Sequence, residues 1–220
     1  MAQIFISHSA KDTELVSFLS KAFASTSVKA VFEEFEAILK GPANAVRVAA
    51  DIRQSNAVFL LLSRTVESLK HTRDWVGWEA GAAGITALET NKDIWVLEPV
   101  ADIESISIVV PHFRHYAAFD PNQPKWQGYI TQIINSYDDS HVLKAISLGA
   151  ATGGAIAEGV GALWGAGAGL LLAMMAANNR PLGLPIRCPE CFSTYNVHLD
   201  QPRMRCPVRN CQLLFPARQE

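Results

Sequence analysis

Residues 57–63 read AVFLLLS, an apolar run that ends at a serine. Because no polar residues alternate within it, the run predicts a strand that is buried on both faces of a sheet. Similar runs are QIFIS at 3–7, KAVFE at 29–33 and DIWVLEP at 93–99, and helical patterns accompany them at about 12–25, 43–55, 73–88 and 125–137. Strands that alternate with helices predict a parallel sheet covered on both faces, a doubly wound α/β domain.

The composition limits the kinds of protein that this chain can be. Its 220 residues suffice for one substantial core and something smaller. Charged residues make up 18% and apolar ones 49%, which indicates a heavily buried domain or a segment that contacts a membrane. The net charge of −2 gives no broad basic surface, so no nucleic acid partner is expected.

Three segments follow one another along the chain. We expect an α/β domain over residues 1–140, a Gly/Ala-rich hydrophobic segment over 145–178, and a small metal-binding unit over 185–217. The opening MAQIFISHSAKD lacks a basic stretch followed by an apolar run, so no secretory signal is predicted there. The first domain is therefore expected in the cytoplasm.

The Gly/Ala-rich segment predicts contact with a lipid bilayer. Residues 159–177 carry no charge, and 19 residues at about 1.5 Å each can cross a hydrocarbon core of about 30 Å. Small residues at every fourth position from 149 to 169 would let helices pack closely. A membrane anchor through 159–177 is the leading interpretation. A helical hairpin packed on protein and a flexible linker are the alternatives.

Four cysteines predict a metal site near the end of the chain. Cys188 and Cys191 form one pair, Cys206 and Cys211 another, and 14 residues separate the pairs. This spacing is typical of a zinc ribbon with four thiolates, in which Zn²⁺ supplies folding energy. Four protein ligands leave no open position for chemistry, so the zinc is expected to be structural. His198 is a spare ligand or an exposed strand residue.

Four motifs in the first domain resemble those of a known family. They are IFISHSAKD at 4–12, KGPANA at 40–45, RQSNAVFLLLS at 53–63 and DWVGWEAG at 74–81. Residues 2–137 thereby resemble the Toll/interleukin-1 receptor (TIR) domain, and bacterial NAD-cleaving members in particular. The resemblance implies a flavodoxin-like, doubly wound parallel sheet of five strands, one more than the runs above place. It also implies NAD⁺ as substrate and self-association through TIR domains, with a loop at about 34–45 as the contact.

The resemblance implies a catalytic role for Glu79, with Trp75 four residues before it. Cleavage of the nicotinamide–ribose bond builds positive charge on the ribose, which a carboxylate stabilises. Indoles beside that carboxylate would exclude water and strengthen the attraction. The alternative is that Glu79 is a partly exposed helix residue, with Trp75 and Trp78 as core anchors. Whether the product is ADP-ribose or a cyclic isomer stays open.

The remaining substrate-binding residues are also implied by the resemblance. They lie at the ends of the first and third strands, where parallel sheets bind ligands, and they are Phe5, Ile6, Ser7, Ser9, Asp12 and Ser63. Asp12 has a second interpretation as the cap of the first helix, and Ser63 as a turn former.

Three functions are compatible with these patterns. The first is an NAD⁺ hydrolase or cyclase that self-assembly activates, in a bacterial defence or cell-death role. The second is a TIR scaffold without enzymatic activity. In the third, the Gly/Ala-rich helix itself disrupts a membrane, and this can accompany the first.

Overall fold

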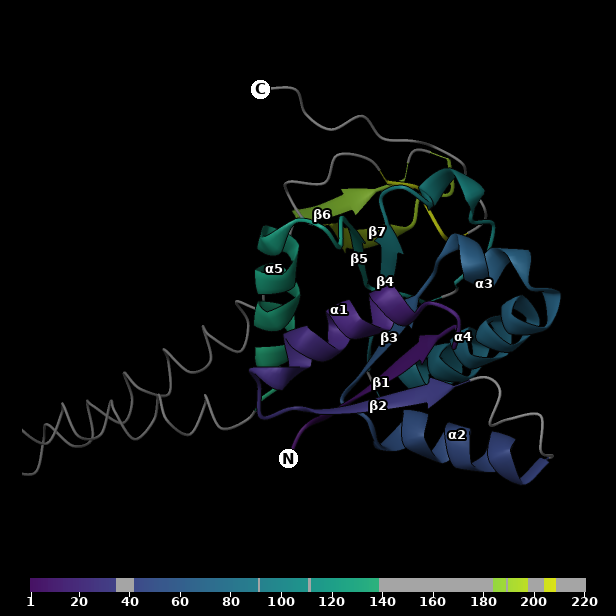
Figure 1. Ribbon diagram of the computed structural model, residues 1–220. Coiled ribbons are helices and arrows are strands. Elements are labelled where there is room, and N and C mark those ends of the chain that lie inside the picture. The colour runs from purple at the N-terminus through teal and green to yellow at the C-terminus, as the bar shows by residue number, and fades with distance from the viewer. Residues whose placement is uncertain are drawn as a thin grey trace, which may run out of the picture.

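The computed structural model describes residues 1–34, 42–90, 92–110, 112–138, 184–188, 190–197 and 204–208 (Figure 1). Several predictions fall outside this part of the chain: the Gly/Ala-rich segment at 145–178, most of the expected contact loop, His198 and Cys211. They stay predictions. Among the helices of the described residues, none is long and apolar enough to span a membrane.

The strands form one mostly parallel sheet. Their bounds are β1 Gln3–His8, β2 Lys29–Glu34, β3 Ala57–Leu61, β4 Asp93–Pro99, β5 His115–Phe119, β6 Leu184–Arg187 and β7 Thr194–Val197. The order across the sheet is β2-β1-β3-β4-β5-β7-β6, and β6, antiparallel to β7, is the one exception to the parallel pairing among these strands. The first five strands follow the flavodoxin-like order 2-1-3-4-5, so the predicted fold class is confirmed at that level.

Helices cover both faces of this sheet (Figure 1). They are α1 Thr13–Ala24, α2 Pro42–Gln54, α3 Arg64–Ser68, α4 Lys70–Thr90, the short 3₁₀ helix η2 Ile103–Ser105 and α5 Pro124–Asn135. α1 and α5 pack together in the core on one face, and α2 and α4 pack in the core on the other. Successive strand residues alternate between these two cores, so Phe5 points to one and its neighbour Ile6 to the other.

The sheet has seven strands, two more than predicted, although the first domain itself contributes the expected five, β1 to β5. β5 was not placed from the sequence, since HYAAF is short and weakly apolar, yet it is buried throughout. The two further strands come from the cysteine-rich segment. β7 pairs with β5 through the registers His115↔Asn196 and Tyr116↔Val197, and β6 pairs with β7. The cysteine-rich segment therefore extends the main sheet.

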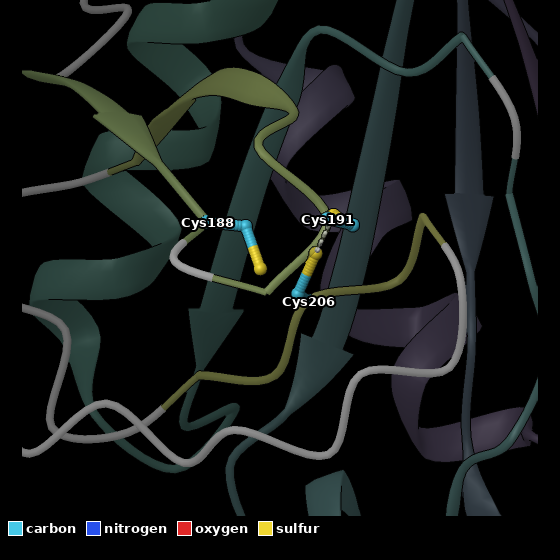
Figure 2. A group of neighbouring side chains, drawn as sticks. All are labelled: Cys188, Cys191 and Cys206. Atoms are coloured by element: carbon cyan, nitrogen blue, oxygen red, sulfur yellow. Dashed lines mark hydrogen bonds between the residues drawn. The ribbon is translucent and has the colours of Figure 1, made fainter.

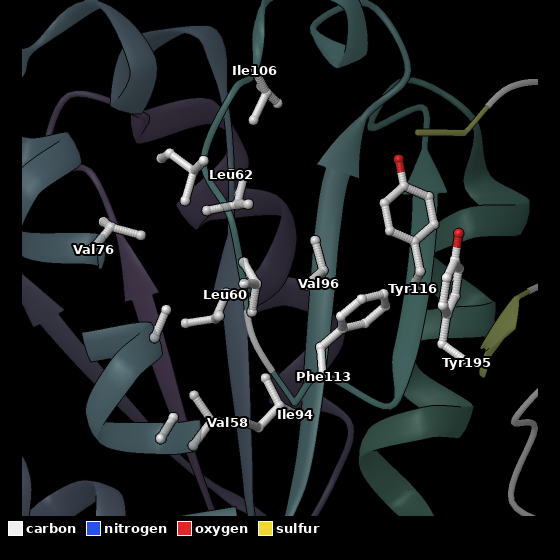
Figure 3. Close-up of a cluster of buried hydrophobic side chains, with 14 of the residues drawn as sticks. Val58, Leu60, Leu62, Val76, Ile94, Val96, Ile106, Phe113, Tyr116 and Tyr195 are labelled. Atoms are coloured by element: carbon white, nitrogen blue, oxygen red, sulfur yellow. The ribbon is translucent and has the colours of Figure 1, made fainter. Parts of the chain in front are cut away.

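The segment between β3 and α4 also differs from expectation. A short helix, α3, begins directly after Ser63, and α4 then runs from Lys70 to Thr90 rather than from about 73 to 88. α4 packs through Val76, Ala80 and Ala83, three or four residues apart, which places one helix face against the sheet. Figure 3 shows Val76 in this core beside the side chains of β3 and β4.

Candidate functional site

Glu79 lies on the buried face of α4, over the end of β1. It comes between the core residues Val76 and Ala80, and only 2% of its surface is exposed. Small neighbours such as Ala80 and Ala83 let the helix approach the sheet closely. The hydroxyl of Ser7, itself fully buried near the carboxyl end of β1, donates a hydrogen bond to Glu79 Oε2. The structure thus joins the predicted catalytic carboxylate to a predicted substrate-binding serine.

The two tryptophans near Glu79 are only partly described. Trp75 lies within α4, but its side chain is outside the described part of the structure. Trp78 has 40% of its surface exposed. The interpretation of Trp78 as a core anchor is therefore wrong, and so is that of Glu79 as a partly exposed helix residue.

Ser63 and Asp12 form a second buried pair. Ser63 Oγ donates to Asp12 Oδ2 at 2.6 Å and accepts from the backbone N–H of Val66 at 3.1 Å, so Ser63 caps α3. Asp12 stands directly before α1, at the N-cap position, but its side chain makes no capping hydrogen bond. The alternative prediction that Asp12 caps the first helix is thus wrong. Its carboxylate holds the start of α3 instead.

The other predicted binding residues lie close by in the chain but differ in character. Ser9 is 2% exposed; its carbonyl accepts from Asp12 N at 3.0 Å and its hydroxyl from Lys11 N at 3.3 Å, which closes the turn after β1. Phe5 and Ile6 are completely buried in the two opposite cores. Their side chains are packing residues in this structure, and their backbones pair with β2 and β3.

Figure 2 shows three cysteines close together, two from the turn between β6 and β7 and one from the segment 204–208. The ligand atoms of Cys188, Cys191 and Cys206 all lie within 4.8 Å of one another. The turn that presents the first two is tight: Cys188 N donates to Ser193 O at 2.9 Å, Phe192 N donates to Cys188 O at 2.9 Å, and Phe192 has a positive φ of 59°. These three residues could bind a metal ion.

The thiols of this cluster differ in acidity. Burial by itself would raise the pKa of Cys191, but hydrogen bonds with Ser193, Cys188 and Cys206 lower it to about 6. Burial raises the pKa of Cys206 to about 12, although the backbone N–H of Val208 opposes this. A bound cation would stabilise both thiolates, since metal ligation deprotonates cysteine.

A buried ion pair beside the cluster was not predicted. Arg205 Nη2 lies 2.6 Å from Glu98 Oε1, and Tyr116 donates to Glu98 Oε2 at 2.7 Å. Burial raises the pKa of Glu98, against the lowering effects of Arg205 and Tyr116. One signal for this ion pair was present in the sequence, because Glu98 is a charged residue near the end of the apolar run DIWVLEP. Nothing near it in the sequence indicated Arg205 as its partner.

No model of a known protein family matches this chain, and no curated protein sequence matches it. The resemblance to TIR domains therefore rests on the motifs. The chemistry of the site has to be argued from its geometry.

Proposed function

We propose that this chain cleaves the bond between nicotinamide and ribose in NAD⁺, with Glu79 as the stabilising carboxylate. The observation that supports this most is the burial of Glu79 among alanines, with Ser7 as a donor at the end of β1. A buried carboxylate is costly, and packing of this helix face against the sheet does not require one. A cost of this kind is typical of a functional site.

Cleavage of this bond requires mainly one negative charge, placed beside the ribose. When the bond from C1′ of the ribose to the nicotinamide nitrogen breaks, its electron pair leaves with nicotinamide and positive charge grows on the ribose. Glu79 would offset this charge, and Ser7 would hold the carboxylate in one orientation. Water then adds to C1′ and loses a proton, or an adenine nitrogen adds and gives a cyclic product. The leaving group is neutral nicotinamide, so no strong acid is needed.

The test is Glu79→Gln, which keeps the side-chain volume and removes the charge. We expect NAD⁺ cleavage to fall by about 10²-fold or more, as for loss of one electrostatic stabiliser. Glu14→Gln is the matched control, because Glu14 is an exposed acid on α1. Nicotinamide release is followed by chromatography, with circular dichroism to verify the fold. Cleavage at the unmodified rate by folded Glu79→Gln protein would refute the proposal.

A scaffold without enzymatic activity is the second candidate. Trp78 and Ile85, seven residues apart on α4, have 40% and 63% of their surfaces exposed. Exposed apolar residues on one helix suit a contact between proteins. If the unmodified chain self-associates but releases no nicotinamide at any concentration, this second function replaces the first.

We further propose that the metal of the cysteine cluster is Zn²⁺, with Cys211 as the fourth ligand. Three thiol sulfurs already lie together, and thiolates favour zinc among the common structural metals. Protein purified without chelator should contain about one zinc per chain by elemental analysis. Cys188→Ser should lose most of the zinc, whereas the control Ala24→Ser, at an exposed position on α1, should keep it. Absence of zinc from the unmodified protein would contradict this assignment.

A further inference from the structure

The short segment 204–208, which carries the metal ligand Cys206, is bonded to the α/β core on both sides of that cysteine. Before it, Arg205 Nη2 donates to the carbonyl of Ile108 at 3.1 Å. After it, the carbonyl of Pro207 accepts from Val110 N at 3.0 Å. Both neighbours of the ligand therefore hold the loop 106–110 that follows β4.

Charge reinforces this attachment. Arg205 Nε donates to Glu98 Oε1 at 2.8 Å, and Tyr116 binds the other carboxylate oxygen. Arg205 is 3% exposed and Glu98 is fully buried. Displacing Arg205 would leave the buried charge of Glu98 uncompensated, which is strongly destabilising.

The loop 106–110 is bonded in turn to α3. Ser107 donates to the carboxylate of Glu67 through both its backbone N–H, at 3.0 Å, and its hydroxyl. Asp102, earlier in the same connection, accepts from Arg64 N at 3.0 Å. α3 begins at Ser63, the hydrogen-bond partner of Asp12. Hydrogen bonds joined by short stretches of backbone thus connect the cysteine cluster to Ser63, two residues after the end of β3.

We propose that a metal ion bound by Cys188, Cys191 and Cys206 holds segment 204–208 in place, and that the segment in turn fixes loop 106–110 and α3. So short a segment cannot be ordered by a core of its own, whereas metal ligation supplies free energy that is available only in the folded arrangement. Metal occupancy thereby sets the order of α3, whose capping residue Ser63 is one of the proposed substrate-binding residues. This last consequence rests on the proposed function; the link between metal and loop does not.

Hydrogen exchange of the full chain tests the link directly. Zinc is removed by a chelator in the presence of a thiol reductant, which prevents a disulfide between Cys191 and Cys206. We expect the backbone amides of Ser107 and Val110 to exchange at least about 10-fold faster without metal, as for a locally opened region. The amide of Ile133 in α5, on the opposite face, should keep its rate. Unchanged exchange at Ser107 and Val110 in the metal-free protein would overturn the proposal.

A double variant covers the case in which the metal-free chain unfolds altogether. Glu98→Gln with Arg205→Met removes both charges together, so neither is left buried alone. With zinc bound, we expect loop exchange to rise in this variant while the zinc content stays at that of the unmodified chain. Exchange equal to that of the unmodified chain would refute the link. Because the readout is exchange, this result is independent of whether Glu79→Gln abolishes NAD⁺ cleavage.

Discussion

Replacement of Ser63 by alanine should destabilise this protein through two bonds at once. The hydroxyl of Ser63 caps α3 by accepting from Val66 N, and loss of such a cap costs about 0.5–2 kcal/mol. The same hydroxyl donates to the carboxylate of Asp12, a residue that is 7% exposed, and this carboxylate would lose its donor. An unsatisfied buried acceptor costs about 1–3 kcal/mol. Together these effects predict a loss of about 1.5–5 kcal/mol from the free energy of unfolding.

Urea denaturation followed by circular dichroism measures this loss, and two further variants apportion it. Ser63→Thr retains the hydroxyl and should cost less than about 1 kcal/mol. Asp12→Ala removes the acceptor. In the double-mutant cycle with Ser63→Ala, the two losses should overlap by at least about 1 kcal/mol, because both remove the same bond. Additive losses, or a cost of Ser63→Ala below about 0.5 kcal/mol, would show that the pair contributes nothing to stability.

Two pH-dependent predictions follow from ionisable groups that are wholly or partly removed from solvent. Burial alone would raise the pKa of Glu67, but the hydrogen bonds from Ser107 and the charge of Arg73 lower it below its usual 4.5. The ionised Glu67 therefore stabilises the fold above that pH, and this stabilisation is lost as pH falls through the lowered pKa. Glu67→Gln should thus be less stable than the unmodified chain at pH 7, and the difference should shrink in acid. A constant deficit in thermal unfolding across pH would contradict this. Burial lowers the pKa of Lys92 to about 8 from 10.5. The unfolded chain then binds more protons between these values, and stability should rise with pH in that window. Lys92→Met should lack this rise. If the thermal unfolding midpoints of Lys92→Met and of the unmodified chain change equally with pH, the lowered pKa of Lys92 is disproved.

The sequence predicted the four strands whose local pattern is an apolar run. β1 to β4 are continuous apolar runs, and a sheet covered on both faces demands such runs. β5 was missed because HYAAF is short and contains a histidine, whose place in the core depends on stacking with Trp95 at a centroid distance of 4.3 Å. β6 and β7 join the sheet through pairing with a strand far away in the chain, and no local pattern encodes that partner.

The sequence predicted which residues make up the candidate site, but not the hydrogen bonds between them. Motif and position drew attention to Glu79, Ser7, Asp12 and Ser63, and the structure brings them together as two buried pairs. The pairing itself could not be foreseen. An aspartate ahead of a helix looks the same whether it caps that helix or reaches a serine 51 positions away. Its partner is decided by which strands lie side by side.

The position of β7 beside β5 also bears on how the chain folds during synthesis. β1 to β5 are made first, whereas β7 emerges only after the long stretch between α5 and β6. At about 5–20 residues per second, β5 would wait several seconds as an open edge strand. Such an edge can pair with another chain, which invites aggregation or exchange of strands between nascent copies. The cysteine-rich segment thus covers β5 late in synthesis and moves the edge of the sheet to β6. Under the proposed metal binding, a shortage of the metal would prolong the interval in which β5 stays uncovered.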